Sequence, residues 1–443
     1  MRSLSEVLAS MGWRLTGSDL SPEASDDSSI EIQEGHLAER INESLDLVIY
    51  SDAVPPANPE VRRARQLGIS AMSYPQMLGR LMSTRHGVAI AGTHGKSTTT
   101  AMAAKILITA GLDPTVIFGA RDLALKSGGR LGRSRWILAE ACEYRTNFRY
   151  LKPQIAAILN VELDHVDCFQ SAADLERAFT AFARRLPPDG LVVARAECAA
   201  TQRTIAGLDC ASESFGLTSN ATWRATSLRE RRGFYTFEIR CRDRLVCDAK
   251  LQVPGQHNVL NALAAAALAS HCGATGTAIR AGLDRFGGLS RRLELVSDSQ
   301  DVMILDDYAH HPTEIAAALA TVRQMAPGRR LWCVLQPHQA SRTGRLLDEF
   351  AHSLTNADKI IVTQIVRARE GNFHPGEVTA DHLAQRVAEM GRDVVHLSSA
   401  AEIKSHLKHS IRPGDVIVTL GAGDIGNVAH DLGQGLRTYR QAG

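Results

Sequence analysis

The stretch that most constrains this chain is residues 92–97, which read Gly-Thr-His-Gly-Lys-Ser. An apolar run at residues 88–91 predicts a buried strand before it, and the Ala- and Leu-containing residues 101–107 predict a helix after it. A glycine-rich turn between a strand and a helix presents backbone N–H groups and a helix N-terminus to an anion. The order therefore predicts a phosphate-binding loop in which Lys96 neutralises a phosphate and Ser97 holds Mg²⁺.

The loop is shorter than the common phosphate-loop pattern G-x-x-x-x-G-K-[ST], which would need glycine at position 90, where Ile90 stands. A string as short as G-x-x-G-K-S also occurs in ordinary turns, so the flanking strand and helix carry the prediction. The candidate nucleotide-binding residues of the loop are Gly92, Thr93, His94, Gly95, Lys96, Ser97 and Thr98.

Composition bounds the class of protein. At 443 residues the chain predicts about three domains, and 44% hydrophobic with 22% charged residues is typical of soluble globular proteins. A net charge of +2 gives no electrostatic case for nucleic acid, and no apolar run approaches the ~18–20 residues of a membrane span. Eight cysteines without a C-x-x-C pair argue against a disulfide framework or a zinc site, and the N-terminus lacks a secretory signal. We therefore expect a cytoplasmic protein with no nucleic-acid partner and no membrane insertion.

Strand and helix signals alternate along most of the chain, which predicts an α/β protein built on parallel sheets. The first domain, residues 1–82, is expected to be an incomplete Rossmann-like unit that opens on a helix. The central domain, residues 83–292, carries the phosphate loop in a P-loop-type ATPase sheet and adds an antiparallel segment at about 214–253. The third domain, residues 293–443, is expected to be a doubly wound, Rossmann-like unit.

Two side chains at predicted strand ends of the central domain are candidates for a Mg²⁺ site. Glu140 follows a predicted strand at 137–139, and His165 comes after one at 155–159. Mg²⁺ prefers few, oxygen-rich ligands, so Glu140 with Ser97 suits it, and His165 is a candidate second-metal ligand or phosphate contact. Either residue alone would be an ordinary surface cap, but the phosphate loop in the same domain favours a metal site.

Further candidates follow the predicted strand at 302–305, where Asp307, His310 and His311 occur close together. Two adjacent histidines on an extended backbone point apart, so we do not expect them to bind one metal ion. We expect this loop to reach into an interdomain cleft, with Asp307 accepting hydrogen bonds from a ribose.

Positive charge is offered by His338 and Arg342, after a predicted strand at 331–335, and by the pair Arg291-Arg292. His338 and Arg342 could neutralise a carboxylate or a developing oxyanion. The arginine pair is either solvated or a phosphate clamp that closes with domain motion. A reaction that uses a neutral amine would also need a general base, for which His310 and His338 are candidates.

Eight motifs occur in an order that resembles the Mur ligase family along essentially the whole chain. They are residues 92–100 (GTHGKSTTT), 140–144 (EACEY), 160–167 (NVELDHVD), 255–262 (GQHNVLNA), 286–292 (FGGLSRR), 306–314 (DDYAHHPTE), 336–343 (QPHQASRT) and 420–425 (LGAGDI). Each is modest alone, but eight in family order are specific. The short spacing of the phosphate loop, which departs from the common pattern, fits this family.

The resemblance implies a three-domain enzyme with ATP and Mg²⁺ as cofactors, and with UDP-N-acetylmuramate and L-alanine as substrates in peptidoglycan precursor synthesis. The muramoyl carboxylate would attack the γ-phosphate of ATP, and the amine of alanine would then displace phosphate from the acyl phosphate. The implied site residues are Lys96 and Ser97 for phosphate and Mg²⁺, Glu140 and His165 for metal, Asn258 and Asn261 for adenine, Arg292 and Asp307 for phosphate and ribose, and His338 and Arg342 for alanine.

The front of the chain departs from the family pattern. Family members begin with a strand and a G-x-G-G-x-G-M-type loop that would bind the UDP pyrophosphate, whereas here Met1 falls where the methionine of that loop would be. We expect a start upstream of Met1, because a sheet without its first central strand would leave hydrogen-bonding edges open. The alternative is a crippled UDP-sugar domain.

Two other functions stay open. A recycling ligase that joins a ready-made tripeptide to UDP-N-acetylmuramate would share the loop and the Asp-Tyr-Ala-His-His-Pro run, although the motifs at 140–144 and 336–343 resemble the alanine-adding type more closely. A non-catalytic ATP-binding relative would fit the incomplete front end. We expect a monomer or a weak homodimer.

Overall fold

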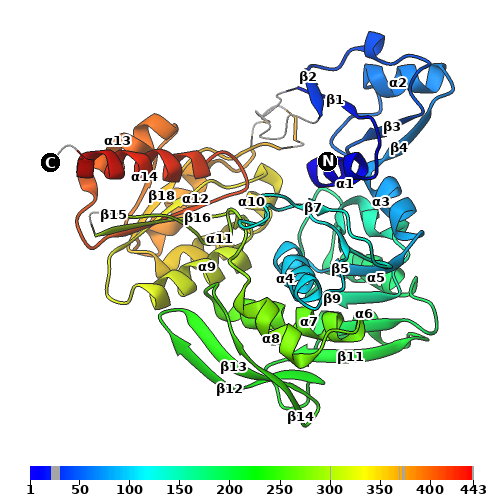
Figure 1. Ribbon diagram of the computed structural model, residues 1–443. Helices are drawn as coiled ribbons and strands as arrows, with labels where there is room; N and C mark the ends of the chain where they lie inside the picture. The colour runs from blue at the N-terminus through cyan, green and yellow to red at the C-terminus, as the bar shows by residue number, and fades with distance from the viewer. Residues whose placement is uncertain (21–29, 300, 369, 372–373, 375, 442–443) are drawn as a thin grey trace. The chain divides into compact units, whose positions relative to one another are not determined.

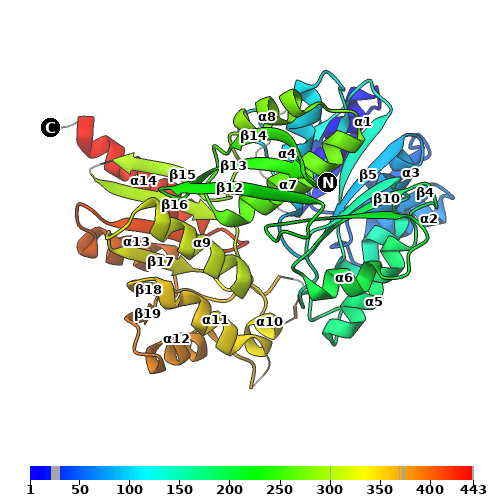
Figure 2. The same ribbon diagram turned by 90° about the horizontal axis from the view of Figure 1, so that it is seen from below.

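The computed structural model describes residues 1–20, 30–299, 301–368, 370–371, 374 and 376–441, and Figures 1 and 2 show its elements from two directions. The chain forms two compact units. The first consists of Met1–Val161, Glu176–Thr222 and Ala264–Gly282, and the second of Glu162–Leu175, Trp223–Leu263 and Leu283–Gly443. The predicted boundaries after residues 82 and 292 stay predictions.

The first unit is built on a mostly parallel sheet with strand order β11-β10-β9-β5-β8-β6-β7. Its strands are β5 (His86–Ala91), β6 (Thr115–Ile117), β7 (Gly129–Arg130), β8 (Trp136–Ala141), β9 (Ile155–Ile158), β10 (Leu191–Arg195) and β11 (Ala211–Gly216). Strand β5 lies between β9 and β8, and every residue after His86 in it is buried. Burial on both faces explains why this strand reads as a continuous apolar run.

The helices that follow these strands along the chain are α4 (Lys96–Thr109), α5 (Ala172–Ala183), α6 (Ala199–Ile205), α7 (Gln256–His271) and α8 (Gly276–Asp284), with a 3₁₀ segment, η2 (Tyr144–Tyr150), after β8. Helix α4 packs against β5 and β8 with most of its residues buried. The helix that starts at the phosphate loop is therefore held firmly by the core of this unit.

The N-terminal residues of the first unit form short elements rather than one continuous sheet. They are α1 (Arg2–Ser10), β1 (Thr16–Asp19), β2 (Glu31–Glu34), η1 (Ala38–Arg40), β3 (Leu47–Tyr50), α2 (Pro59–Gln66), β4 (Ser70–Ser73) and α3 (Tyr74–Met82). The four strands pair in parallel as β1–β2 and β3–β4. Helix α1 packs on β6 and β7, where Ser3 Oγ donates to the Phe118 carbonyl at 2.6 Å and Ser127 Oγ donates to Glu6 Oε2 at 2.5 Å.

The second unit contains a six-stranded sheet in the order β15-β16-β20-β17-β18-β19. Its elements are β15 (Glu294–Ser299), β16 (Val302–Asp307), α9 (Pro312–Met325), β17 (Leu331–Leu335), α10 (Ala340–Arg345), α11 (Leu347–Ser353), η3 (Leu354–Asn356), β18 (Lys359–Val362), α12 (Ala380–Glu389), β19 (Val394–His396), α13 (Ala400–Ser410), β20 (Val416–Leu420) and α14 (Gly426–Gln441). Only the pairing of β15 with β16 is antiparallel among the strand pairings described for this sheet.

Alternate residues of these strands enter two separate cores. Cys333 packs with α9, α11 and α12 on one face of the sheet, whereas its neighbours Trp332 and Val334 pack with α13 and α14 on the other. The period of two expected for a strand covered on both faces confirms the doubly wound arrangement predicted for this part of the chain.

The second unit also holds the antiparallel strands β12 (Trp223–Arg231), β13 (Phe234–Cys241) and β14 (Arg244–Lys250), where the sequence predicts an antiparallel segment. Two strands extend past their predicted ends to include candidate site residues. Glu140 lies within β8 and Asp307 within β16, because their pairing with Ile90 and Leu420 continues to those residues. Helix α7 starts at Gln256 and therefore includes Asn258 and Asn261.

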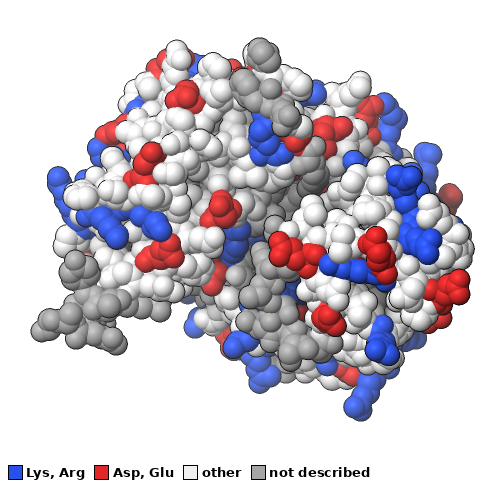
Figure 3. Space-filling view, turned by 90° about the horizontal axis from the view of Figure 1, so that it is seen from above, with Lys and Arg blue, Asp and Glu red and all other residues white. Residues whose placement is uncertain are grey.

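Figure 3 shows one face of the molecule, on which Lys and Arg are interspersed with Asp and Glu. A face of mixed sign lacks the single-sign field that attracts nucleic acid. Among the residues with described structure, none of the helices has the length and apolarity needed to cross a bilayer.

Candidate active site

The phosphate loop joins β5 to α4, and its two glycines adopt backbone conformations that suit glycine. Gly92 has φ +144° and Gly95 has φ +82°. At Gly92 an added Cβ would also lie 2.9 Å from Leu159 Cβ, so a side chain is excluded by contact as well as by conformation. The first N–H groups of α4, which begins at Lys96, therefore face the loop, as an anion-binding helix N-terminus requires.

Asn160, two residues after β9, holds this loop in place through hydrogen bonds. Its Oδ1 accepts from the His94 N–H at 2.8 Å, its Nδ2 donates to the His94 carbonyl at 3.1 Å, and its own carbonyl accepts from the Thr93 N–H at 3.2 Å. Sequence reasoning gave Asn160 no role. Its position just after a predicted strand, where loops at the carboxyl ends of parallel strands meet, could have indicated a role.

Lys96 folds back on its own loop. Its Nζ donates to the Gly92 and Thr93 carbonyls and lies 3.0 Å from each carboxylate oxygen of Glu143. Burial by itself would lower the pKa of Lys96, but the Glu143 carboxylate outweighs burial and the pKa is raised above its ordinary value. The lysine is thus a permanent cation at the loop, and Glu143 is a partner that the sequence analysis did not find.

Glu140 projects from β8, the strand beside β5. Its Oε1 is buried and has no hydrogen-bond partner among the described residues, and an added Cβ at Gly119 would lie 3.3 Å from Oε2. A buried carboxylate oxygen left without a donor is costly unless a cation satisfies it. Together with Ser97 in the first turn of α4, Glu140 supplies the oxygen ligands that suit Mg²⁺.

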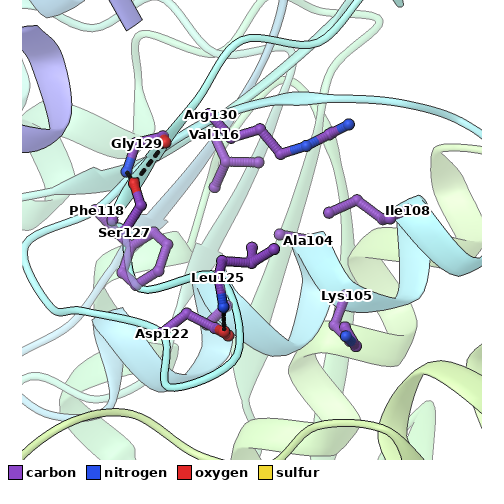
Figure 4. A pocket seen from close by; sticks show the side chains of 12 residues that line it. Ala104, Lys105, Ile108, Val116, Phe118, Asp122, Leu125, Ser127, Gly129 and Arg130 are labelled. Atoms are coloured by element: carbon purple, nitrogen blue, oxygen red, sulfur yellow. Dashed lines mark hydrogen bonds between the residues drawn. The ribbon is translucent and has the colours of Figure 1, made fainter. Parts of the chain in front are cut away.

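A small hollow lies on another side of α4, drawn in Figure 4. It is lined mainly by apolar groups of α4 and of the β6–β7 segment, including Ala104, Ile108 and Leu125. Its volume of about 20 Å³ is room for about one water molecule, so it does not fit a nucleotide.

In the second unit, the segment Glu162–Leu175 is fixed to the C-terminal elements. Arg342 Nε donates to Asp164 Oδ1 at 2.7 Å, with the two side chains 2% and 7% exposed. Burial would raise the pKa of Asp164, but the Arg342 guanidinium holds it well below its ordinary range. His165 has φ +50°, and its N–H donates to Asp164 Oδ1 at 2.7 Å. A strained backbone at a non-glycine residue is common at functional sites.

The two histidines after β16 have different environments. His311 caps α9: its Nδ1 accepts from the Thr313 N–H at 3.3 Å, which leaves Nε2–H to donate to the Leu163 carbonyl at 3.2 Å. His310 Nδ1 lies 3.0 Å from the Tyr308 carbonyl, which can only accept, so Nδ1 carries the proton and Nε2 has a lone pair. The predicted divergence of the two rings is confirmed by these separate partners.

His310 and His338 meet edge to face with ring centroids 5.9 Å apart. Burial lowers the pKa of His310 to about 4, partly offset by Glu314. His310 is therefore neutral at pH 7 and has a lone pair on Nε2, but a pKa of about 4 makes it a weaker base than an ordinary histidine, and its role as general base stays a prediction.

The adjacent arginines differ sharply. Arg291 donates to Asp306 Oδ2 at 2.9 Å, and to the carbonyls of Gly423 and Gly421 at 2.8 and 2.7 Å. It therefore links β16 to the loop after β20. The Arg292 guanidinium lies 5.3 Å from the Tyr308 ring centroid and makes no hydrogen bond or ion pair with any described residue.

Asp307 and the two asparagines are positioned by backbone and amide contacts. Asp307 accepts from the N–H groups of Leu293 and Ala309 at 2.7 Å each, and burial raises its pKa to about 6. Asn261 Nδ2 donates to Asn258 Oδ1 at 3.0 Å, and Asn258 Nδ2 donates to the Pro254 carbonyl at 2.6 Å. The asparagine side chains thus form a short chain of amides at the start of α7.

The predicted site residues fall into two groups. The first unit contains the phosphate loop with Lys96, Ser97 and Thr98, and Glu140 on the strand beside β5, whereas the second unit contains His165, Asn258, Asn261, Arg292, Asp307, His310, His338 and Arg342. Asn160, Glu143 and Asp164, for which the sequence analysis proposed no role, hold members of these groups in place.

Comparison with known proteins gives three matching family models: the Mur ligase family catalytic domain over residues 1–86, the Mur ligase middle domain over 90–269 and the Mur ligase glutamate ligase domain over 291–423. A UDP-N-acetylmuramate–L-alanine ligase from Acetivibrio thermocellus is 37% identical over 96% of this chain and 91% of its own length. The chain belongs to the Mur ligase family. A relative of the same name from Salinibacter ruber is 38% identical over 96% of this Mur ligase and 90% of its own length.

Solved structures resemble this Mur ligase over its whole length. A UDP-N-acetylmuramate-alanine ligase from Thermotoga maritima matches with a TM-score of 0.81 and 25% identity, covering 100% of this chain and 96% of that one. A murein peptide ligase from Psychrobacter arcticus matches with a TM-score of 0.72 and 26% identity, covering 98% and 96%. The family resemblance expected from the eight motifs is confirmed.

Proposed function

We propose that this Mur ligase joins L-alanine to the carboxylate of UDP-N-acetylmuramate, with ATP converted to ADP and phosphate. The observation that carries the proposal is the phosphate loop, in which Lys96 and the N-terminus of α4 lie near the half-buried carboxylate of Glu140, whose Oε1 is buried. The choice of substrates is supported by relatives 36–38% identical over nearly the full chain that carry the name of this ligase.

The first half of the reaction is transfer of the γ-phosphoryl group of ATP to the muramoyl carboxylate. Such a transfer needs alignment and neutralisation of charge more than covalent help from the protein. Lys96 and the loop N–H groups would hold the β- and γ-phosphates, with Asn160 keeping the loop in shape. Ser97 and Glu140 would hold Mg²⁺, with His165 as a further ligand; when bound, the ion neutralises charge on the phosphates.

The nucleotide would also be held by residues of the second unit. Arg292, whose guanidinium lies over the Tyr308 ring and whose charge acts on the Asp307 carboxyl, is suited to a phosphate. Asp307 would accept hydrogen bonds from the ribose, and the amides of Asn258 and Asn261 would approach adenine.

In the second half, the amine of L-alanine displaces phosphate from the acyl phosphate. The amine must lose a proton, and the lone pair on neutral His310 Nε2 can accept it. Arg342 and His338 would contact the alanine carboxylate. Because ATP and UDP-sugars are cytoplasmic metabolites, we expect the protein to act in the cytoplasm.

A solved murein peptide ligase also resembles this chain. The preference for alanine or for a peptide as the substrate separates the two functions. The purified protein is incubated with ATP, Mg²⁺ and UDP-N-acetylmuramate, and with either L-alanine or the tripeptide L-alanyl-γ-D-glutamyl-meso-diaminopimelate. Mass spectrometry should find the alanyl product with a kcat/KM at least tenfold above that for the peptide. A preference for the tripeptide would assign the recycling reaction instead.

A further inference from the structure

The contact between Lys96 and Glu143 suggests a role for Glu143 in the nucleotide cycle. An ammonium group has three N–H donors. Here they are shared among two loop carbonyls and both carboxylate oxygens of Glu143, at 3.1 Å from Thr93 O and 3.0 Å from each carboxylate oxygen. Lys96 therefore has no N–H group left for a phosphate while these contacts last.

Glu143 is held rigidly in this position. Its side chain is only 1% exposed, and its carbonyl accepts from the Thr146 N–H at 2.8 Å. The turn that follows contains Arg145 and Thr146 in left-handed conformations and is anchored by buried Phe148, whose ring stacks on Phe182 with centroids 4.8 Å apart. A carboxylate fixed in this way does not follow Lys96 when the lysine moves.

A nucleotide phosphate and Glu143 consequently compete for the same cation. Of the partners named, the carbonyls belong to the loop itself and are neutral, whereas Glu143 is the anion that phosphate oxygens resemble in charge and hydrogen bonding. Exchange of one anion for another keeps Lys96 neutralised both before binding and after product release. It also lowers the net gain from binding, because a charge-assisted contact is broken for each one formed.

Building on the proposed function, we propose that Glu143 is a positioning residue that holds Lys96 when the loop is empty, yields it to the phosphates of ATP, and recaptures it as ADP leaves. Glu143 thereby limits nucleotide affinity and speeds ADP release. Without it, the loop would bind ADP more tightly and turn over more slowly.

The test compares wild type with Glu143→Gln, which keeps the shape and one acceptor oxygen but removes the competing charge. ADP affinity is measured by calorimetry with and without Mg²⁺, and ADP dissociation by stopped-flow displacement of a fluorescent ADP. Glu143→Gln should bind ADP about tenfold more tightly and release it correspondingly more slowly, with KM for ATP and kcat both reduced. Asp189→Asn, which removes a carboxylate from an exposed turn of the same unit, should leave ADP binding unchanged.

A second measurement reads Lys96 directly. In the absence of nucleotide, acetic anhydride should label Lys96 several-fold faster in Glu143→Gln than in wild type, as quantified by mass spectrometry of the loop peptide. Unchanged or weaker ADP binding by Glu143→Gln, or unchanged Lys96 labelling, would overturn the proposal. Weaker binding confined to Mg²⁺-containing buffer would instead assign Glu143 to the metal. If wild type binds no ADP at all, the proposed function fails rather than this inference.

Discussion

Asp164 and Arg342, which are 178 residues apart in the sequence, form a buried ion pair in which Arg342 Nε donates to Asp164 Oδ1 at 2.7 Å. The pair joins the segment after β9 to helix α10, and Arg345 adds a hydrogen bond to the Gln170 carbonyl at 2.5 Å. The backbone of His165, next to Asp164, is thus set by the residue proposed to contact alanine. A substrate that moves Arg342 would therefore also shift the backbone of His165, which is a candidate metal ligand.

Removing one member of this buried pair should be strongly destabilising. Asp164→Ala leaves the Arg342 cation buried with its ion-pair partner gone, and we expect the free energy of unfolding to fall by about 3–5 kcal/mol in urea titrations followed by circular dichroism. The control is Glu176→Ala, which breaks the exposed pair of Arg203 with Glu176 at 2.6 Å and should lower the free energy of unfolding far less, because solvent screens an exposed pair. Equal losses of unfolding free energy in the two variants would show that the buried Asp164–Arg342 pair contributes no more to stability than the exposed pair.

Substitutions of Asn160 should act on nucleotide binding. Asn160→Asp keeps the shape, but its carboxylate cannot donate to the His94 carbonyl and adds negative charge beside the phosphate loop. The KM for ATP should rise about tenfold or more, while the KM for alanine changes little. Initial-rate measurements with one substrate varied at a time check this, and an unchanged KM for ATP would contradict the role of Asn160 in shaping the loop.

The neighbouring arginines should separate stability from activity. Arg291→Ala removes three hydrogen bonds that Arg291 donates, one to β16 and two to the loop after β20, and we expect a loss of about 2–4 kcal/mol in the free energy of unfolding. Arg292→Ala should keep wild-type stability and lower kcat/KM for ATP at least about 100-fold, as for removal of a phosphate contact. The contrast is tested by unfolding and steady-state kinetics on both variants. An Arg291→Ala protein as stable as wild type would show that the contacts of Arg291 with β16 and with the loop after β20 do not stabilise the fold.

The pKa values of His310 and Asp307 predict opposite effects of pH on stability. His310 has a pKa of about 4, below the ordinary 6.5, so the stability it contributes is complete above pH 6.5 and is lost as the pH falls towards 4. Asp307 has a pKa of about 6, above the ordinary 3.8, so its contribution is complete below pH 3.8 and is lost as the pH rises towards 6. Between pH 6.5 and 4, the free energy of unfolding of His310→Gln should therefore fall less steeply with decreasing pH than that of wild type. Urea titrations at several pH values measure this slope. An unchanged slope would place the His310 pKa near its ordinary value.

Most of the fold could be predicted because the strands of this protein are buried on both faces and read as continuous apolar runs. Strand β17, for example, occupies the predicted residues 331–335. The ends of β8 and β16 were misplaced because Glu140 and Asp307 are polar and look like loop residues. Their neighbours in the sheet, which a local pattern does not reveal, continue the ladder through them.

The site was less predictable than the fold. Lys96 and Glu140 stand in recognisable places after strands, but Glu143 and Asp164 matter only through partners that are distant in sequence, 47 and 178 residues away. A single chain carries no local signal for such pairs. Among the described N-terminal residues, the four strands form two separate parallel pairs, which the sequence pattern did not indicate.

Release of inorganic phosphate reports whether Lys96 anchors an ATP-dependent ligation of alanine to UDP-N-acetylmuramate. Phosphate is measured with ATP and Mg²⁺ in the presence of both substrates, of each alone and of neither, for wild type and Lys96→Ala. Wild type should release phosphate at a substantial rate only when UDP-N-acetylmuramate and L-alanine are both present, and Lys96→Ala should lose at least about 100-fold of that rate while remaining folded. Phosphate release at the same rate without one of the two substrates, or full activity of Lys96→Ala, would rule out this reaction or this role of Lys96.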